Sequence, residues 1–157
     1  MDFELDSVHV ITAILLADLK EEIYDKIRDG CLTQQGKGGK VLRLIKSLYG
    51  LKQSPRAWNE ALDTYLKSIG FMPTSSEQCI YVGRWQTTTC YILVYVDDML
   101  IAAPNRKIMA NIKAKIYSKF PITGNGPLSF WLNMHFIRKQ NNENKFYTSR
   151  TKDCQAS

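Results

Sequence analysis

The feature that most constrains the fold of this chain is an apolar run with two adjacent acids in its middle. Residues 91–103 read Tyr-Ile-Leu-Val-Tyr-Val-Asp-Asp-Met-Leu-Ile-Ala-Ala. The β-branched and aromatic content on both sides of Asp97 and Asp98 predicts two strands joined at the acids. Ionised groups beside an apolar core need a cationic partner or a metal ion. The pair therefore indicates either a metal-binding hairpin or an ordinary hairpin whose acidic turn faces water.

Two amphipathic helices are expected. Residues 54–69 carry apolar side chains at helical spacing, with Ser54 as the N-cap and Gly70 after the last turn. Trp58 lies on this apolar stripe, which predicts a core residue. Residues 105–119 repeat isoleucine at every fourth position and place their basic residues mostly on other faces.

Strands are expected in the runs rich in β-branched and aromatic residues: 79–82, 87–96, 99–103, 131–138 and 145–148. The segment 3–16 predicts a strand that runs into a short helical turn. Loops are expected at 30–40, 72–78 and 124–127, where glycine and polar residues interrupt the apolar patterns. Helices that alternate with antiparallel hairpins predict an α+β fold, a two-layer sandwich with an antiparallel sheet packed on helices.

The charge is distributed unevenly along the chain. The whole sequence has 157 residues and a net charge of +6, while residues 1–30 carry −5, so the rest carries +11. A basic body with an acidic strip is compatible with a nucleic-acid enzyme that has metal-binding carboxylates, and a solvated charge gradient is the alternative. A hydrophobic fraction of 45% excludes intrinsic disorder and collagen-like repeats.

Neither a targeting signal nor a membrane span is expected. The first residues are acidic, and the apolar run 8–17 is too short to cross a bilayer. An intracellular protein, cytoplasmic or nuclear and without a membrane partner, is therefore predicted. The cysteines are widely spaced and form no C-x-x-C pair, which favours reduced packing thiols over structural zinc: Cys31, Cys79, Cys90 and Cys154.

Two motifs in this order resemble those of one polymerase family. Tyr95-Val96-Asp97-Asp98 between apolar flanks resembles the active-site hairpin of reverse transcriptases. Residues 47–58, Ser-Leu-Tyr-Gly-Leu-Lys-Gln-Ser-Pro-Arg-Ala-Trp, and the acidic segment 17–24 resemble copia-type retrotransposon polyproteins. The resemblance runs from about Glu4 to about Ser149. It implies a polymerase palm, so residues 1–157 are expected to form one partial reverse transcriptase domain without fingers, thumb or ribonuclease H.

The resemblance also implies a chemistry. It implies RNA-directed DNA polymerisation by two-metal phosphoryl transfer, with two Mg²⁺ ions, or Mn²⁺, as cofactor. RNA or DNA template–primer and deoxynucleoside triphosphates would be the partners. Asp97 would face the metals, and Asp98 would assist from the hairpin tip. The residues implied in nucleotide or template binding are Tyr49, Gly50, Lys52, Gln53, Arg56 and Ile14.

Two residues are candidates for the third metal ligand. Local context indicates Asp6, whereas counting back from Asp18 along the matching stretch indicates His9. The two alignments differ by three residues, and an odd shift moves side chains to the other face of a strand. Imidazole suits Zn²⁺ better than Mg²⁺, so His9 in that place predicts a severe loss of activity. An ordinary histidine on a half-buried strand is the other interpretation of His9.

Two further positions depart from the family pattern. Ile14 stands where the family usually has an aromatic residue that rejects the ribose 2′-hydroxyl. Asn133 replaces a turn glycine, a mild change because asparagine tolerates left-handed backbone. Two functions follow from the whole sequence: a reverse transcriptase palm that is weak or inactive as a fragment, or a catalytically dead retroelement remnant that at most binds nucleic acid.

Overall fold

The structure is a computed structural model that describes residues 3–26, 41–85, 87–139 and 145–150. The chain divides into two compact units. Residues 1–11 and 66–157 form one, which we call the sheet unit, and residues 12–65 form the other, the hairpin unit. The described residues form a mixed α/β fold with antiparallel sheets and three helices, which agrees with the predicted fold class at that level. The loop expected at 30–40 lies outside the described residues.

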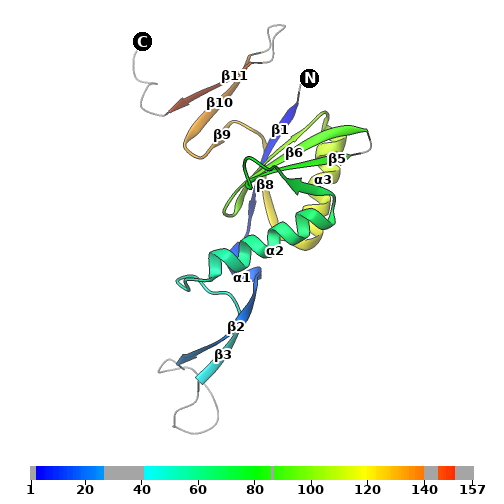
Figure 1. Ribbon diagram of the computed structural model, residues 1–157. Helices are drawn as coiled ribbons and strands as arrows, with labels where there is room; N and C mark the ends of the chain where they lie inside the picture. The colour runs from blue at the N-terminus through cyan, green and yellow to red at the C-terminus, as the bar shows by residue number, and fades with distance from the viewer. Residues whose placement is uncertain (1–2, 27–40, 86, 140–144, 151–157) are drawn as a thin grey trace. The chain divides into compact units, whose positions relative to one another are not determined.

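A six-stranded sheet dominates the sheet unit, with every neighbouring pair antiparallel (Figure 1). Its strands, in spatial order, are β4 (Phe71–Pro73), β5 (Ile80–Trp85), β6 (Thr88–Tyr95), β7 (Asp98–Ala103), β1 (Glu4–Val10) and β8 (Ile122–Pro127). The N-terminal strand β1 is thus inserted between β7 and β8. This insertion brings residues 4–10 next to the strand that begins at Asp98.

One face of this sheet is buried, so buried and more exposed residues alternate along its strands. On β7, Met99, Ile101 and Ala103 are fully buried, while the residues between them are half-buried. On the neighbouring β6, Cys90 and Ile92 are fully buried. Alternation with a period of two is what a strand with one face against the core requires.

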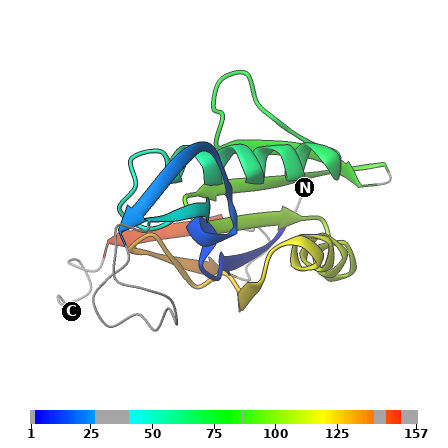
Figure 2. The same ribbon diagram turned by 90° about the horizontal axis from the view of Figure 1, so that it is seen from below.

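Helix α3 (Arg106–Lys119) contacts β1 and β7. Asn105 caps it, because its side-chain oxygen accepts a hydrogen bond from the backbone N–H of Ile108 at 2.9 Å. The buried positions of α3 are Ile108, Met109, Ile112 and Ile116, which confirms the stripe predicted from the sequence. Figure 2 shows the sheet and α3, in yellow, from a second direction.

A smaller three-stranded sheet completes the sheet unit, with β9 (Phe130–Trp131), β10 (Met134–Lys139) and β11 (Lys145–Arg150) in the order β11-β10-β9. Leu132 and Asn133 join β9 to β10 in a two-residue turn, with φ of 49° and 61°. Two left-handed residues in succession are typical of the type I′ hairpin turn. Asparagine thus takes the left-handed conformation that the sequence predicted for it.

The hairpin unit contains α1 (Ala13–Leu16), β2 (Asp18–Lys26), β3 (Val41–Lys46) and most of α2 (Ser54–Ser68). Strands β2 and β3 form an antiparallel pair. Trp58 on α2 is 2% exposed, which confirms its prediction as a core residue. The prediction of Ser54 as N-cap is wrong, because Ser54 is already the first residue of α2 and Gln53 accepts the hydrogen bond from the N–H of Ala57. The hydroxyl of Ser54 donates to the carbonyl of Leu48 at 2.6 Å and ties the helix start to the preceding turn.

The other predicted helices and strands are confirmed with shifted ends, and the segment 3–16 is a strand followed by a short helix. The single strand predicted over 131–138 is wrong, because the turn at Leu132 and Asn133 divides this run between β9 and β10. The loop predicted at 124–127 is wrong, because this segment is part of β8 and pairs with β1. Gly126 there has a φ of +69°, and the pairing shifts register between Asp6 and Val8, so the strand is irregular. The loop predicted at 72–78 begins inside β4. No helix within the described ranges is long and apolar enough to span a membrane.

Candidate metal centre

The two adjacent acids lie where β6 ends and β7 begins. Tyr95 pairs with Asp98, so Val96 and Asp97 form a two-residue turn. Val96 has a φ of 56°, a region that β-branched residues rarely adopt, and such strained turns occur at functional sites. The carbonyl of Asp97 accepts a hydrogen bond from the N–H of Val10 at 2.8 Å, which ties the turn to β1.

This arrangement corrects the expected positions of the two acids. Asp98 was expected at the hairpin tip, but Asp97 lies in the turn and Asp98 is the first residue of β7. Because the pair straddles the boundary between turn and strand, the rule that neighbouring strand residues face opposite sides does not apply to it.

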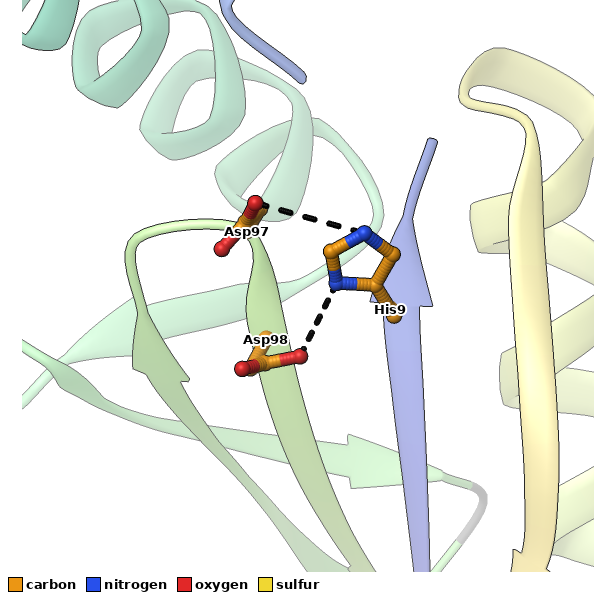
Figure 3. A group of neighbouring side chains, drawn as sticks. All are labelled: His9, Asp97 and Asp98. Atoms are coloured by element: carbon orange, nitrogen blue, oxygen red, sulfur yellow. Dashed lines mark hydrogen bonds and ion pairs between the residues drawn. The ribbon is translucent and has the colours of Figure 1, made fainter. Parts of the chain in front are cut away.

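Both carboxylates face the imidazole ring of His9, one toward each ring nitrogen (Figure 3). In the pairing of β1 with β7, His9 is opposite Asp98. Its Nδ1 is 3.0 Å from Oδ1 of Asp98, and its Nε2 is 4.0 Å from Oδ2 of Asp97. The side chains of His9, Asp97 and Asp98 are 43%, 34% and 36% exposed, so the group is open to solvent. One ligand atom from each residue lies within 4.8 Å of the others.

Asp6 lies on the opposite face of β1. It pairs with Ile101, and Val8 pairs with Met99, so Asp6 shares the buried face of the sheet. Asp6 and His9 are three positions apart, and an odd difference places two side chains on opposite faces of a strand. Of the two residues indicated by the sequence as third ligand, the structure brings His9 to Asp97 and Asp98.

Two cations on α3 engage the carboxylate of Asp6, whose side chain is 6% exposed. Nη1 of Arg106 donates to Oδ1 at 2.5 Å, and Nζ of Lys113 donates to Oδ2 at 2.9 Å. Arg106 also pairs with Glu4. Sequence reasoning missed this cluster, although a signal exists: Arg106 and Lys113 are seven residues apart, which places them on one face of a helix.

The donor set of His9, Asp97 and Asp98 is suited to one divalent ion. Two metal–ligand bonds of about 2.1 Å span at most about 4.2 Å. The 4.0 Å between Nε2 of His9 and Oδ2 of Asp97 lies within this reach. The two carboxylates suit Mg²⁺, but the imidazole does not, since hard Mg²⁺ ions prefer oxygen ligands. The three side chains therefore do not fit a pair of Mg²⁺ ions.

The residues that the resemblance implied in nucleotide binding belong to the hairpin unit. Tyr49 is 65% exposed, and Gly50 has a φ of +93°, a left-handed conformation that favours glycine. Lys52 is exposed and Gln53 is half-buried, both in the turn before α2. Ile14 is buried in α1.

Arg56 forms an ion pair on the first turns of α2. Its Nε donates to Oε1 of Glu60 at 2.9 Å, and Lys20 also donates to Glu60. The hydrogen bond from Lys20, and then that from Arg56, hold the pKa of Glu60 below its usual value. The hydrogen bond to Glu60 raises the pKa of Arg56. The guanidinium therefore stays charged, and a phosphate would have to compete with Glu60 for it.

Comparison with known proteins identifies the family. Residues 2–149 match the family described as Reverse transcriptase (RNA-dependent DNA polymerase). The chain is 37% identical over 153 residues to the Retrovirus-related Pol polyprotein from transposon TNT 1-94 of Nicotiana tabacum, which covers 97% of this chain and 11% of the relative. It is 32% identical over 129 residues to the Retrovirus-related Pol polyprotein from transposon RE2 of Arabidopsis thaliana, covering 82% of this chain and 9% of the relative.

A yeast retrotransposon polyprotein is also similar to this chain. The chain is 34% identical over 130 residues to the Transposon Ty1-DR1 Gag-Pol polyprotein of Saccharomyces cerevisiae, covering 80% of this chain and 7% of the relative. The chain thus spans about a tenth of these polyproteins. No solved structure matches it significantly. The match over nearly its whole length shows that this chain belongs to the reverse transcriptase (RNA-dependent DNA polymerase) family, with copia-type retrotransposon Pol polyproteins as its relatives.

Proposed function

We propose that this chain is the palm segment of a copia-type RNA-directed DNA polymerase, acting inside the cell, and that it holds a divalent metal ion and contacts template–primer. The observation that carries the proposal is the meeting of His9, Asp97 and Asp98 at one hairpin. Polymerases transfer a nucleotidyl group with divalent metal ions, which neutralise the triphosphate and lower the pKa of the attacking hydroxyl. Carboxylates held by a rigid framework suit that role: Asp98 begins β7, and Asp97 in the turn is tied to β1 through its own backbone.

The activity is proposed to be weak with Mg²⁺. The third side chain at the hairpin is an imidazole, and Asp6 is committed to Arg106 and Lys113. In the part of the chain that the structure describes, the negative charge at the hairpin is therefore limited to Asp97 and Asp98. Weak electrostatic stabilisation of the bound nucleotide follows from that shortage.

The turn before α2 and its first helical turn are proposed to contact substrate. The exposed cations Lys52 and Arg56 would contact phosphates, and the exposed ring of Tyr49 would stack on a base or sugar. Gly50 would allow close approach of a nucleotide to the backbone. Gln53 would donate a hydrogen bond to the template, and Ile14 would occupy the position next to the ribose.

Primer extension tests the proposed reaction. The assay uses an RNA template, a DNA primer and deoxynucleoside triphosphates, with Mg²⁺ or Mn²⁺. We expect slow incorporation by the unmodified chain, loss of incorporation in Asp97→Asn/Asp98→Asn, and no change in the matched control Asp25→Asn, an exposed acid of β2. Equal incorporation by the unmodified chain and the double variant would contradict the proposal. Binding of nucleic acid without any incorporation would support a catalytically dead remnant instead.

Salt-dependent binding tests the proposed substrate contacts. Each lost phosphate contact lowers the slope of log affinity against log salt concentration by about 1. We therefore expect Lys52→Ala to weaken template–primer binding and to reduce this slope by about 1. Lys119→Ala, a substitution at an exposed position at the end of α3, is the matched control. Identical slopes for the unmodified chain and Lys52→Ala would exclude a phosphate contact at Lys52.

A further inference from the structure

The side chains at the hairpin form a mixed nitrogen and oxygen donor set, and we infer that Nε2 of His9 and the carboxylate of Asp97, with Asp98 holding the imidazole in place, bind one transition-metal dication and prefer Zn²⁺ to Mg²⁺. Imidazole binds Zn²⁺ readily, whereas Mg²⁺ demands oxygen ligands in near-octahedral geometry. The inference builds on the proposed function because it uses the same site. It requires only metal binding, so it and the polymerase proposal can fail separately.

Backbone pairing holds the three side chains together. His9 is opposite Asp98 in the ladder between β1 and β7, and the next residue, Val10, donates its N–H to the carbonyl of Asp97. The backbone positions of His9, Asp97 and Asp98 are thus fixed by strand register and by one hydrogen bond across the turn. A donor set fixed by the fold loses little conformational freedom when an ion binds.

The orientation of the ring offers a nitrogen to a bound ion. A neutral imidazole has one N–H and one nitrogen lone pair. When Nδ1 carries the proton, it donates to Oδ1 of Asp98 across 3.0 Å. The lone pair of Nε2 then lies on the side of Asp97, whose Oδ2 is 4.0 Å away. A histidine that donates one N–H to a carboxylate and binds metal through its other nitrogen is a frequent arrangement in metal sites.

The neighbouring acids of β1 do not complete an oxygen cage for Mg²⁺. Asp6 lies on the other face of the strand with Arg106 and Lys113, and Glu4 pairs with Arg106. Within the described part of the chain, His9, Asp97 and Asp98 form the single group of three histidine, cysteine, aspartate or glutamate side chains close enough to hold an ion. Among the described residues, Mg²⁺ would therefore find two carboxylates and no third.

Isothermal titration calorimetry with the metal ion alone tests the inference. Zn²⁺ and Mg²⁺ are titrated separately into the chain, in which Cys31, Cys79 and Cys154 are replaced by serine so that thiols do not capture Zn²⁺. We expect one Zn²⁺ per chain with a Kd about 100-fold lower than that of Mg²⁺, a ratio of the size that loss of a single supporting partner produces in metal sites. Equal affinities, or tighter binding of Mg²⁺, would overturn the inference.

Substitutions at the two histidines assign the binding to the hairpin. His9→Asn keeps a polar side chain of similar size and is expected to weaken Zn²⁺ binding about 100-fold while leaving Mg²⁺ binding little changed. His135→Asn, on β10, is the matched control and is expected to bind Zn²⁺ as the parent does. Unchanged Zn²⁺ binding by His9→Asn would overturn the inference.

His9→Asp tests the same selectivity in reverse, since it supplies a third carboxylate. We expect it to bind Mg²⁺ more tightly and Zn²⁺ relatively less tightly than the parent. Circular dichroism establishes whether each variant is folded. If His9→Asp does not fold, the Zn²⁺ affinities of His9→Asn and His135→Asn still test whether His9 binds the ion. Zn²⁺ selectivity without primer extension would contradict the polymerase proposal alone. Primer extension with Mg²⁺ and no Zn²⁺ preference would contradict this inference alone.

Discussion

Replacement of Asp6 by asparagine tests whether this carboxylate stabilises the fold or binds a metal ion. The carboxylate is buried on the core face of β1 and accepts one charged hydrogen bond from Arg106 and one from Lys113. Asparagine has almost the same size, but it loses the negative charge and one of the two acceptor oxygens. Both cations then face the sheet without their shared counter-charge.

The magnitude follows from burial. Removing one partner of a buried ion pair costs about 3–5 kcal/mol, because the remaining charge is left buried. Here the side chains of Arg106 and Lys113 are 49% and 25% exposed, so water compensates part of their charge, and Arg106 keeps Glu4. We therefore expect the free energy of unfolding of Asp6→Asn to fall by about 2 kcal/mol. For a chain of this size that corresponds to a fall in Tm of about 4–8 °C.

Urea denaturation followed by circular dichroism measures the effect, with Asp25→Asn at an exposed position as control, for which we expect a change below about 0.5 kcal/mol. A double-mutant cycle with Lys113→Met isolates the pair. Zn²⁺ affinity is measured on the same protein and is expected to be unchanged. A stability equal to that of the control would refute the argument from burial. A loss of Zn²⁺ affinity without loss of stability would make Asp6 a ligand.

Three further substitutions or reactions test the packing. A Cβ added at Gly83 would lie 2.6 Å from a ring carbon of Phe71, so Gly83→Ala is expected to lower the free energy of unfolding by about 1–3 kcal/mol in urea denaturation. Asn105→Ala removes the cap of α3 and is expected to lower Tm through a loss of about 1 kcal/mol, measured by thermal unfolding. Burial raises the pKa of the Cys90 thiol, so Cys90 stays protonated and is expected to react with iodoacetamide only on unfolding. The exposed Cys79 is expected to react in the native state. Mass spectrometry distinguishes the two products in a chain whose other two cysteines are replaced by serine.

The same raised pKa gives a pH dependence with a defined sign. Folded Cys90 keeps its proton at a pH at which the unfolded thiol has lost it, so unfolding releases a proton above a pH of about 9.0, the ordinary value of a thiol. Stability is therefore expected to decrease as the pH rises above that value, by an amount that disappears in Cys90→Ala. Denaturation curves at several alkaline pH values measure it, and parallel pH profiles for the two proteins would contradict the explanation.

The local sequence pattern predicts much of the fold. The isoleucine spacing of residues 105–119 and the apolar run around Asp97 and Asp98 each indicate an element with one buried face. Such a face can be predicted locally, because its residues recur with the period of the helix or strand. Trp58 and Asn133 were predicted for the same reason, because a helical stripe and a left-handed turn are local properties.

Long-range pairing accounts for what the sequence left open. Strand β1 lies between β7 and β8, and this order depends on contacts between segments about a hundred residues apart. The same pairing makes residues 124–127 a strand despite their glycines. Alternation alone places Asp6 and His9 on opposite faces, but only the register with β7 shows that the face of His9 is the one that carries Asp98.

The most direct test of the account is nuclear magnetic resonance of the histidine side chains while Zn²⁺ is added. The sequence has two histidines, His9 and His135, so two sets of imidazole ¹⁵N signals are expected. The account predicts that one equivalent of Zn²⁺ shifts the ring nitrogens of His9, leaves those of His135 unchanged, and shifts neither in Asp97→Asn/Asp98→Asn. Unchanged His9 signals, or a shift that persists in the double variant, would contradict a metal centre at this hairpin.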